Sequence, residues 1–283
     1  MEIKNVSVIG GGTMGNGIVH LFALKGFNVN LVEINKELAD KTIATITKNL
    51  ERQVKKDTIS ETDKIRTLSK INKVIGINNI PSNSDLIIEA IYENKQAKLN
   101  IFRELKDRVN EDSIFASNTS SISITELSTQ SRPERFIGMH FMNPVPVMQL
   151  VEIIRGYSTS SETFETIKAL SIKLGKTPVE VFDYPGFVSN RILMPMINEA
   201  IFALMEGVAT VQDIDTVMKL GMNHPMGPLT LADFIGLDVC LSIMDVLYSG
   251  FNDSKYRPCP LLKKMVAANK LGRKTGEGFY KYT

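Results

Sequence analysis

Two patterns of apolar and polar residues alternate through the first part of the chain. Short apolar runs rich in Val and Ile are typical of buried parallel strands, and the longer charged stretches between them, with apolar spacing near 3.6, indicate helices. The expected strands are 6–9, 29–32, 86–88, 113–116, 136–141, 150–154 and 179–182, and the expected helices are 14–25, 35–56, 94–109 and 161–174. This alternation predicts an α/β domain built on a doubly wound parallel sheet.

The pattern changes after DYPGF, residues 183–187. Helical spacing then continues through 188–206, 211–220 and 229–249, and strand-like alternation hardly recurs. We therefore expect a boundary between Tyr184 and Pro185, with an α/β domain at 1–184 and a smaller all-helical domain at 185–283.

Composition and charge narrow the class of protein. Of the 283 residues, 43% are hydrophobic and 23% charged, and the net charge of +2 gives no reason to expect nucleic acid or a membrane surface as a partner. No apolar run approaches the ~18–20 residues of a membrane span. The chain starts directly in a strand-like run, so we expect no signal peptide. Cys240 and Cys259 form no C-x-x-C pair, and no cluster has metal-ligand spacing, which predicts a reduced, cytoplasmic protein without a metal.

A glycine motif follows the first expected strand and opens the first expected helix. In a Rossmann-like domain the first glycine allows a tight turn, the second lets a pyrophosphate approach the backbone, and the third lets the helix pack close to the sheet. Glu33 ends the second expected strand, where a carboxylate would bind the ribose hydroxyls and repel a 2′-phosphate. The motif predicts an NAD(H) site, and the alternative is a glycine turn that binds no nucleotide. The expected cofactor loop contains Gly10, Gly12, Thr13, Met14 and Gly15.

His140 and Glu152 are a candidate acid–base pair. His140 lies at the end of a strand predicted late in the sheet, and Glu152 lies in the next strand, after the turn-rich NPVPV. Because ligands bind outside the carboxyl ends of parallel strands, adjacent strand ends could bring the two side chains together. A carboxylate bonded to one ring nitrogen fixes the tautomer and raises the basicity of the other nitrogen. The alternative is a structural histidine and a surface glutamate.

Four longer segments resemble the short-chain (3S)-3-hydroxyacyl-CoA dehydrogenase family, and within it the stand-alone bacterial 3-hydroxybutyryl-CoA dehydrogenases. They are SNTSSISITEL, GMHFMNPVPVMQLVEII, PGFVSNRIL and GRKTGEGFYKY, in the family's order over nearly the whole chain. The resemblance implies an oxidoreductase that interconverts (3S)-3-hydroxybutyryl-CoA and acetoacetyl-CoA with NAD(H). It implies that His140 is the base for the 3-hydroxyl proton and that Glu152 orients and polarises it. Ser120 would hydrogen-bond the substrate oxygen, and Asn190 would reach the reacting group.

The same resemblance implies further binding residues. Lys274 would approach the nicotinamide end. Asn49 and Lys56, seven residues apart on one helical face, would bind coenzyme A together with Ser120, whereas the alternative for KNLERQVKK is a solvated helix face. The residues that would line the cofactor side are Glu93, Lys98, Asn118, Ser120 and Asn143.

Two rival functions stay open at this point. One is a dehydrogenase of another β-hydroxy acid, acting on a free acid or a sugar acid. The other is a non-catalytic NAD(H)-binding or structural relative. The family usually pairs through its helical domain, so the resemblance also implies a homodimer. The remaining histidines, His20 and His224, are expected to be structural.

Overall fold

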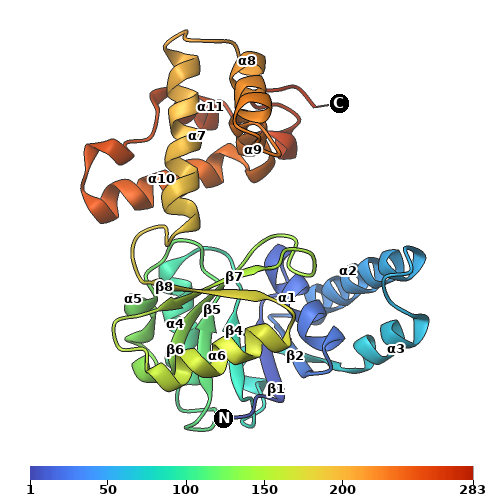
Figure 1. The fold of residues 1–283 in the computed structure, drawn as a ribbon. Coiled ribbons are helices and arrows are strands. Elements are labelled where there is room, and N and C mark those ends of the chain that lie inside the picture. The colour runs from blue at the N-terminus through green and yellow to red at the C-terminus, as the bar shows by residue number, and fades with distance from the viewer. Residues whose placement is uncertain (283) are drawn as a thin grey trace. The chain divides into compact units, whose positions relative to one another are not determined.

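An eight-stranded sheet is the frame of the first of two compact units (Figure 1). The computed structural model describes residues 1–282. The chain divides into unit 1, Met1–Asp183, and unit 2, Tyr184–Thr283. Unit 1 is mixed α/β and unit 2 is helical, which confirms the predicted fold class.

The strands of unit 1 pair in the order β3-β2-β1-β4-β5-β6-β7-β8. The chain winds outward from β1 to β3 and then returns to β4 on the other side of β1. In a doubly wound sheet, ligands bind outside the carboxyl ends of the strands at such a switch point. The strands are β1 (Asn5–Ile9), β2 (Asn28–Glu33), β3 (Ile71–Ile75), β4 (Leu86–Glu89), β5 (Ile114–Ser117), β6 (Phe136–Phe141), β7 (Leu150–Arg155) and β8 (Thr177–Phe182).

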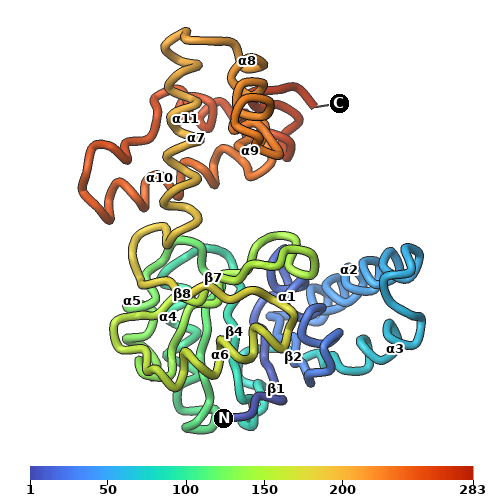
Figure 2. The backbone as a smooth tube through the Cα atoms, in the orientation of Figure 1, coloured from blue at the N-terminus to red at the C-terminus, as the bar shows by residue number. Residues whose placement is uncertain are grey.

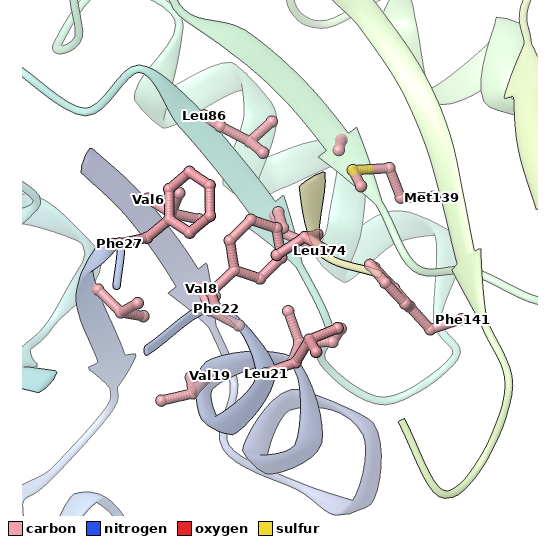
Figure 3. Close-up of a cluster of buried hydrophobic side chains, with 14 of the residues drawn as sticks. Val6, Val8, Val19, Leu21, Phe22, Phe27, Leu86, Met139, Phe141 and Leu174 are labelled. Carbon is pink, nitrogen blue, oxygen red and sulfur yellow. The ribbon is translucent and has the colours of Figure 1, made fainter. Parts of the chain in front are cut away.

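Helices cover both faces of this sheet. On one face, side chains of α1, α2 and α6 join those of the strands in a core cluster that includes Phe22 and Phe141 (Figure 3). On the other face, the Phe102 ring of α4 packs edge-on against Phe115 and Phe136. The helices are α1 (Thr13–Leu24), α2 (Lys36–Lys55), α3 (Glu61–Ser69), α4 (Lys95–Leu105), α5 (Ile124–Ser128) and α6 (Ser161–Lys173), with 3₁₀ turns η1 (Ile77–Asn79) and η2 (Pro133–Arg135).

The sheet differs from the prediction in two respects. The edge strand β3 was not expected, because it buries only Val74 and so lacks a long apolar run. The helix α3 before it was not expected either. The sheet is also not wholly parallel, since β6 and β7 are antiparallel. A parallel crossover needs about a dozen residues or more, and the connection at 142–149 is too short for one.

Unit 2 consists of helices around its own apolar core, and Figure 2 follows the chain through them from yellow to red. The helix expected at 229–249 is two helices, because Gly236, at φ +104°, lies between them. None of the helices in residues 1–282 has the length and apolar character needed to span a bilayer. The elements are α7 (Ser189–Met205), α8 (Val211–Thr216), the π-helical η3 (Val217–Gly221), α9 (Pro228–Ile235), α10 (Leu237–Phe251), η4 (Ser254–Tyr256), α11 (Pro260–Ala267) and η5 (Arg273–Thr275).

Candidate functional site

The glycine loop joins β1 to α1 at the carboxyl edge of the sheet. Gly10 has φ +91°, and a Cβ on Gly15 would lie 1.8 Å from the Gly10 carbonyl oxygen. These two glycines are therefore required by the turn and by the close packing of the helix on it. A Cβ on Gly12, in contrast, would meet nothing within 4 Å. The protein itself does not require a glycine there, so the open space suits the close approach of a ligand.

Glu33 lies in the wall of a cavity beside this loop. Its Oε1 accepts a hydrogen bond of 2.6 Å from the Gly11 backbone N–H. The cavity has a volume of about 760 Å³, and its wall combines the glycine loop with the apolar side chains of Ile34, Ile91 and Ile101. A mostly apolar cavity with an acidic side chain, beside the N-terminus of a helix, fits the adenosine half of a dinucleotide. The described residues therefore fit NAD.

His140 and Glu152 face each other directly across the β6–β7 pair. His140 Nδ1 lies 2.7 Å from Glu152 Oε2, and both side chains are buried. From the sequence we expected the two side chains to come together at the carboxyl ends of neighbouring parallel strands. Their meeting arises instead from antiparallel register, in which opposite residues have adjacent side chains. An Nδ1–H donated to the carboxylate leaves Nε2 free of a proton and able to accept one.

Ser120 is the next member of this chain of hydrogen bonds. Its Oγ lies 3.0 Å from His140 Nε2, on the side of the ring away from Glu152. Ser120 follows β5 at the carboxyl edge of the sheet. Glu152, His140 and Ser120 thus form a connected chain of hydrogen bonds within unit 1.

Glu93 holds the segment that carries Ser120. Its Oε1 accepts hydrogen bonds from Thr119 Oγ1 at 2.5 Å, from the Ser120 N–H at 3.0 Å and from Ser121 N–H and Oγ at 3.2 and 3.1 Å. Burial alone would raise the pKa of Glu93. The Lys98 ammonium and the hydrogen bonds together lower the pKa by more than burial raises it, so the net pKa is below the usual value. Glu93 is therefore charged at neutral pH.

Lys98 is buried, at 1% exposure, and joins two carboxylates. Its Nζ lies 2.7 Å from Glu89 Oε1 and 3.2 Å from Glu93 Oε2. Burial raises the pKa of Glu89 above its usual value, although Lys98 and hydrogen bonds from Ser117 and the Ile91 backbone oppose the shift. The Lys98 ammonium therefore faces the two carboxylates rather than the cavity beside Glu33.

Two of the expected asparagines, Asn118 and Asn143, follow the carboxyl ends of β5 and β6. Asn118 Oδ1 accepts the Phe141 N–H at 3.0 Å. Asn143 is exposed and begins the connection to β7 with a cis peptide bond to Pro144. Lys176 Nζ, at the far side of this connection, donates to the Val145 and Met148 carbonyl oxygens, both at 2.6 Å. The loop after His140 is thus fixed by a buried lysine.

The other expected residues belong to α2 and to unit 2. Asn49 is half-buried on α2 and accepts a hydrogen bond from Arg52, and the exposed Lys56 caps the same helix. Asn190 lies in the first turn of α7 and is buried. Lys274 forms an ion pair with Asp238. Around it, the C-terminal segment is held to unit 2 by buried Asp233, which accepts the backbone N–H groups of residues 279 and 280.

Both units match models of one protein family. Residues 5–184 match the 3-hydroxyacyl-CoA dehydrogenase NAD binding domain, and residues 186–282 match the 3-hydroxyacyl-CoA dehydrogenase C-terminal domain. The chain belongs to the 3-hydroxyacyl-CoA dehydrogenase family. The family resemblance seen in the sequence is thereby confirmed.

Relatives within the 3-hydroxyacyl-CoA dehydrogenase family match the chain from end to end. It is 54% identical to a probable 3-hydroxybutyryl-CoA dehydrogenase of Bacillus subtilis, over 100% of this chain and 98% of the relative. It is 43% identical to the human mitochondrial hydroxyacyl-coenzyme A dehydrogenase, over 99% of this chain and 91% of that protein. The crystal structure of (S)-3-hydroxybutyryl-CoA dehydrogenase from Ralstonia eutropha has a TM-score of 0.97 and 50% identity, with both chains fully covered.

Sequence reasoning missed two buried residues of this 3-hydroxyacyl-CoA dehydrogenase site. Glu89 ends β4 and binds Lys98, and Lys176 holds the loop after His140. A glutamate at the end of an apolar strand that faces the switch point was a usable signal for Glu89. Lys176 had no such signal, because a lysine beside a glycine in a turn is usually solvated.

Proposed function

We propose that this chain interconverts (3S)-3-hydroxybutyryl-CoA and acetoacetyl-CoA with NAD(H). The observation that supports the proposal best is the Glu152–His140–Ser120 hydrogen-bonded chain, which ends at the same carboxyl edge of the unit 1 sheet as the glycine loop. Two bacterial relatives, each 54% identical over nearly the full length, support the choice of a short acyl-CoA, since one is named a probable 3-hydroxybutyryl-CoA dehydrogenase and the other a 3-hydroxybutyryl-CoA dehydrogenase.

Glu152, His140 and Ser120 are proposed to act as a relay for the proton of the 3-hydroxyl group. His140 Nε2 accepts that proton during oxidation and returns it during reduction, and Glu152 stabilises the imidazolium that forms. The Ser120 hydroxyl hydrogen-bonds the substrate oxygen and stabilises the negative charge that develops there. Asn190 is proposed, from its motif, as a second donor to the reacting group.

The cofactor is NAD(H), which supplies the hydride acceptor for oxidation and the hydride donor for reduction when it is bound. We propose that Gly12, Thr13 and Met14 bind its pyrophosphate at the N-terminus of α1, with Gly10 and Gly15 shaping the turn. Glu33 binds the adenosine ribose. The residues proposed for the nicotinamide half are Glu93, Lys98, Asn118, Asn143 and Lys274.

Coenzyme A is proposed to bind along α2. Lys56 is exposed and provides a cation for the phosphates, and the half-buried Asn49 side chain provides a hydrogen-bonding group seven residues earlier. Asn49 already accepts a hydrogen bond of 2.6 Å from Arg52, which supplies a second cation on this face.

The proposal extends to the oligomeric state and the compartment. A homodimer through unit 2 is proposed, and sedimentation of the purified protein tests it. The cytoplasm is the proposed compartment, since Cys240 and Cys259 are both free and buried.

Substrate-dependent oxidation of NADH tests the proposed function. We expect turnover with acetoacetyl-CoA and little with free acetoacetate, because the free acid lacks the coenzyme A contacts. NADPH should support a much lower rate than NADH. Equal rates with the free acid would favour a dehydrogenase of another β-hydroxy acid. Tight NADH binding without turnover of any thioester would favour a non-catalytic relative.

A further inference from the structure

A buried ionic cluster at the carboxyl edge of the sheet is formed by Glu89, Lys98 and Glu93. The Glu89 and Lys98 side chains are 0% and 1% exposed, whereas that of Glu93 is 37% exposed. Removing one partner of a buried ion pair leaves a buried charge without compensation, which is strongly unfavourable. The position of Lys98 therefore depends on both carboxylates, and mostly on the fully buried Glu89.

Glu89 is the member of the cluster that is fixed by the sheet. It is the last residue of β4 and lies opposite Ser117 of β5 in register. Its Oε1 accepts the Ile91 N–H at 2.7 Å as well as Lys98, and its Oε2 accepts Ser117 Oγ at 2.6 Å. Both carboxylate oxygens are thus committed to partners on rigid elements.

Glu93, in contrast, lies in the connection between β4 and α4. Four hydrogen bonds from residues 119–121 converge on its Oε1, and Lys98 holds its other oxygen. The far end of the same segment is held separately, because Asp183 accepts Ser123 Oγ at 2.7 Å and the Thr125 N–H at 2.8 Å. Residues 119–121 are therefore held mainly by Glu93, beside a longer hydrogen bond of 3.2 Å from the Thr119 N–H to Ser117 Oγ.

We propose that Glu89 is a positioning residue that holds Ser120 against His140 through Lys98 and Glu93. This inference rests on the proposed function, in which Ser120 Oγ serves the substrate oxygen beside His140 Nε2. With Glu89 neutral, Lys98 has a single carboxylate partner, and its ammonium moves toward Glu93. Glu93 then turns, and the hydrogen bonds that fix residues 119–121 weaken.

The first test is amide hydrogen exchange, which needs no activity. In Glu89→Gln, we expect the amides of Ser120 and Ser121 to exchange faster than in the wild type. The matched control is Asp85→Asn, at the opposite end of the same strand, where the carboxylate binds the Lys4 and Asn5 N–H groups. The control should leave the exchange of Ser120 and Ser121 unchanged. Unchanged exchange in Glu89→Gln would overturn the proposal, whatever the activity.

The second test is kinetic and separates a positioning role from a merely structural one. Glu89→Gln should lower kcat about 10- to 100-fold, as misplacement of a reacting group does. In the Ser120→Ala background the same substitution should cost little more, because its effect passes through Ser120. Equal losses in both backgrounds would overturn the proposal. Wild-type protein that does not turn over acetoacetyl-CoA would contradict the proposed function instead, and the exchange result would still stand.

A second variant keeps the tests decisive if Glu89→Gln does not fold. Glu89→Gln combined with Lys98→Met removes both buried charges and leaves neither unpaired. The exchange of Ser120 and Ser121 should increase in this pair variant too, since Glu93 has lost its anchor. Protection equal to that of the wild type would contradict the role of the cluster.

Discussion

At the scale of single residues, the hydrogen bond between His140 and Glu152 is the basis for the proposal that the two side chains act as one acid–base unit. His140→Gln should lose the proton transfer, which typically contributes ~10²–10⁴-fold to the rate. Glu152→Gln keeps the shape of the side chain but removes the charge that stabilises the imidazolium, so kcat should also fall severely. Steady-state kinetics with acetoacetyl-CoA and NADH measures both effects.

The double variant provides the decisive comparison for this pair. Residues that share one task lose it only once, so His140→Gln with Glu152→Gln should be little worse than the poorer single variant. NADH affinity, measured by fluorescence, should stay nearly unchanged in all three variants because neither residue belongs to the glycine loop. Fully additive losses would mean that the two residues act separately.

Glu33 accepts the Gly11 N–H and is proposed to exclude a 2′-phosphate, and two substitutions separate these two roles. Glu33→Gln keeps an oxygen for the Gly11 N–H but removes the repulsion of a 2′-phosphate. The preference for NADH over NADPH should narrow by about 1 kcal/mol, or roughly fivefold in the ratio of kcat/KM values. Glu33→Ala also removes the hydrogen bond, so it should weaken both cofactors. A wild-type enzyme that uses NADPH as well as NADH would contradict this role.

At the scale of elements, the sequence predicted what apolar periodicity encodes and missed what tertiary contacts decide. The meeting of His140 with Glu152 was left open by the local pattern and implied by the family resemblance, whereas the buried strands and the glycine loop followed from the local pattern. The antiparallel register that produces this meeting did not, since it depends on the length of a connection rather than on strand composition. The edge strand β3 was missed because only Val74 is buried. Lys176 was missed because its partners lie far away in the sequence, whereas Glu89, nine residues from its partner Lys98, had a usable signal at the end of β4.

Lys176 gives a test at this scale, because it holds the connection between β6 and β7. Lys176→Met leaves the Val145 and Met148 carbonyl oxygens without their donor, so the free energy of unfolding should fall by about 1–3 kcal/mol. Urea denaturation measures this loss. The matched control is Lys173→Met, where an exposed lysine should change stability by less than about 0.5 kcal/mol. Equal stability of the two variants would mean that the hydrogen bonds from Lys176 do not stabilise the connection.

At the scale of the whole molecule, each unit has its own hydrophobic core. Unit 1 buries the cluster between its sheet and the helices α1, α2 and α6, and unit 2 buries a separate cluster among its helices. Units with separate cores need not unfold together. A local substitution should therefore be followed with probes in both units, so that a loss of stability can be assigned to one of them.

His20 connects the core of unit 1 to the pH dependence of stability. Its side chain on α1 is fully buried, and burial lowers its pKa below the ordinary 6.5, although the hydrogen bond that its Nε2 donates to Gln53 Oε1 opposes the shift. At a pH above 6.5 the histidine is neutral in both the folded and the unfolded chain, so it does not change the free energy of unfolding with pH. As the pH falls below 6.5, the unfolded chain binds a proton that the folded chain does not, and stability is lost. The loss for this one group is at most ~1.4 kcal/mol per pH unit.

His20→Gln removes the group, so the variant should lose less stability than the wild type between about pH 7 and about pH 5 in urea denaturation. Above about pH 7 the two slopes should coincide. If the stability of the wild type and that of His20→Gln fell in parallel down to about pH 5, His20 would take up its proton equally in the folded and unfolded states.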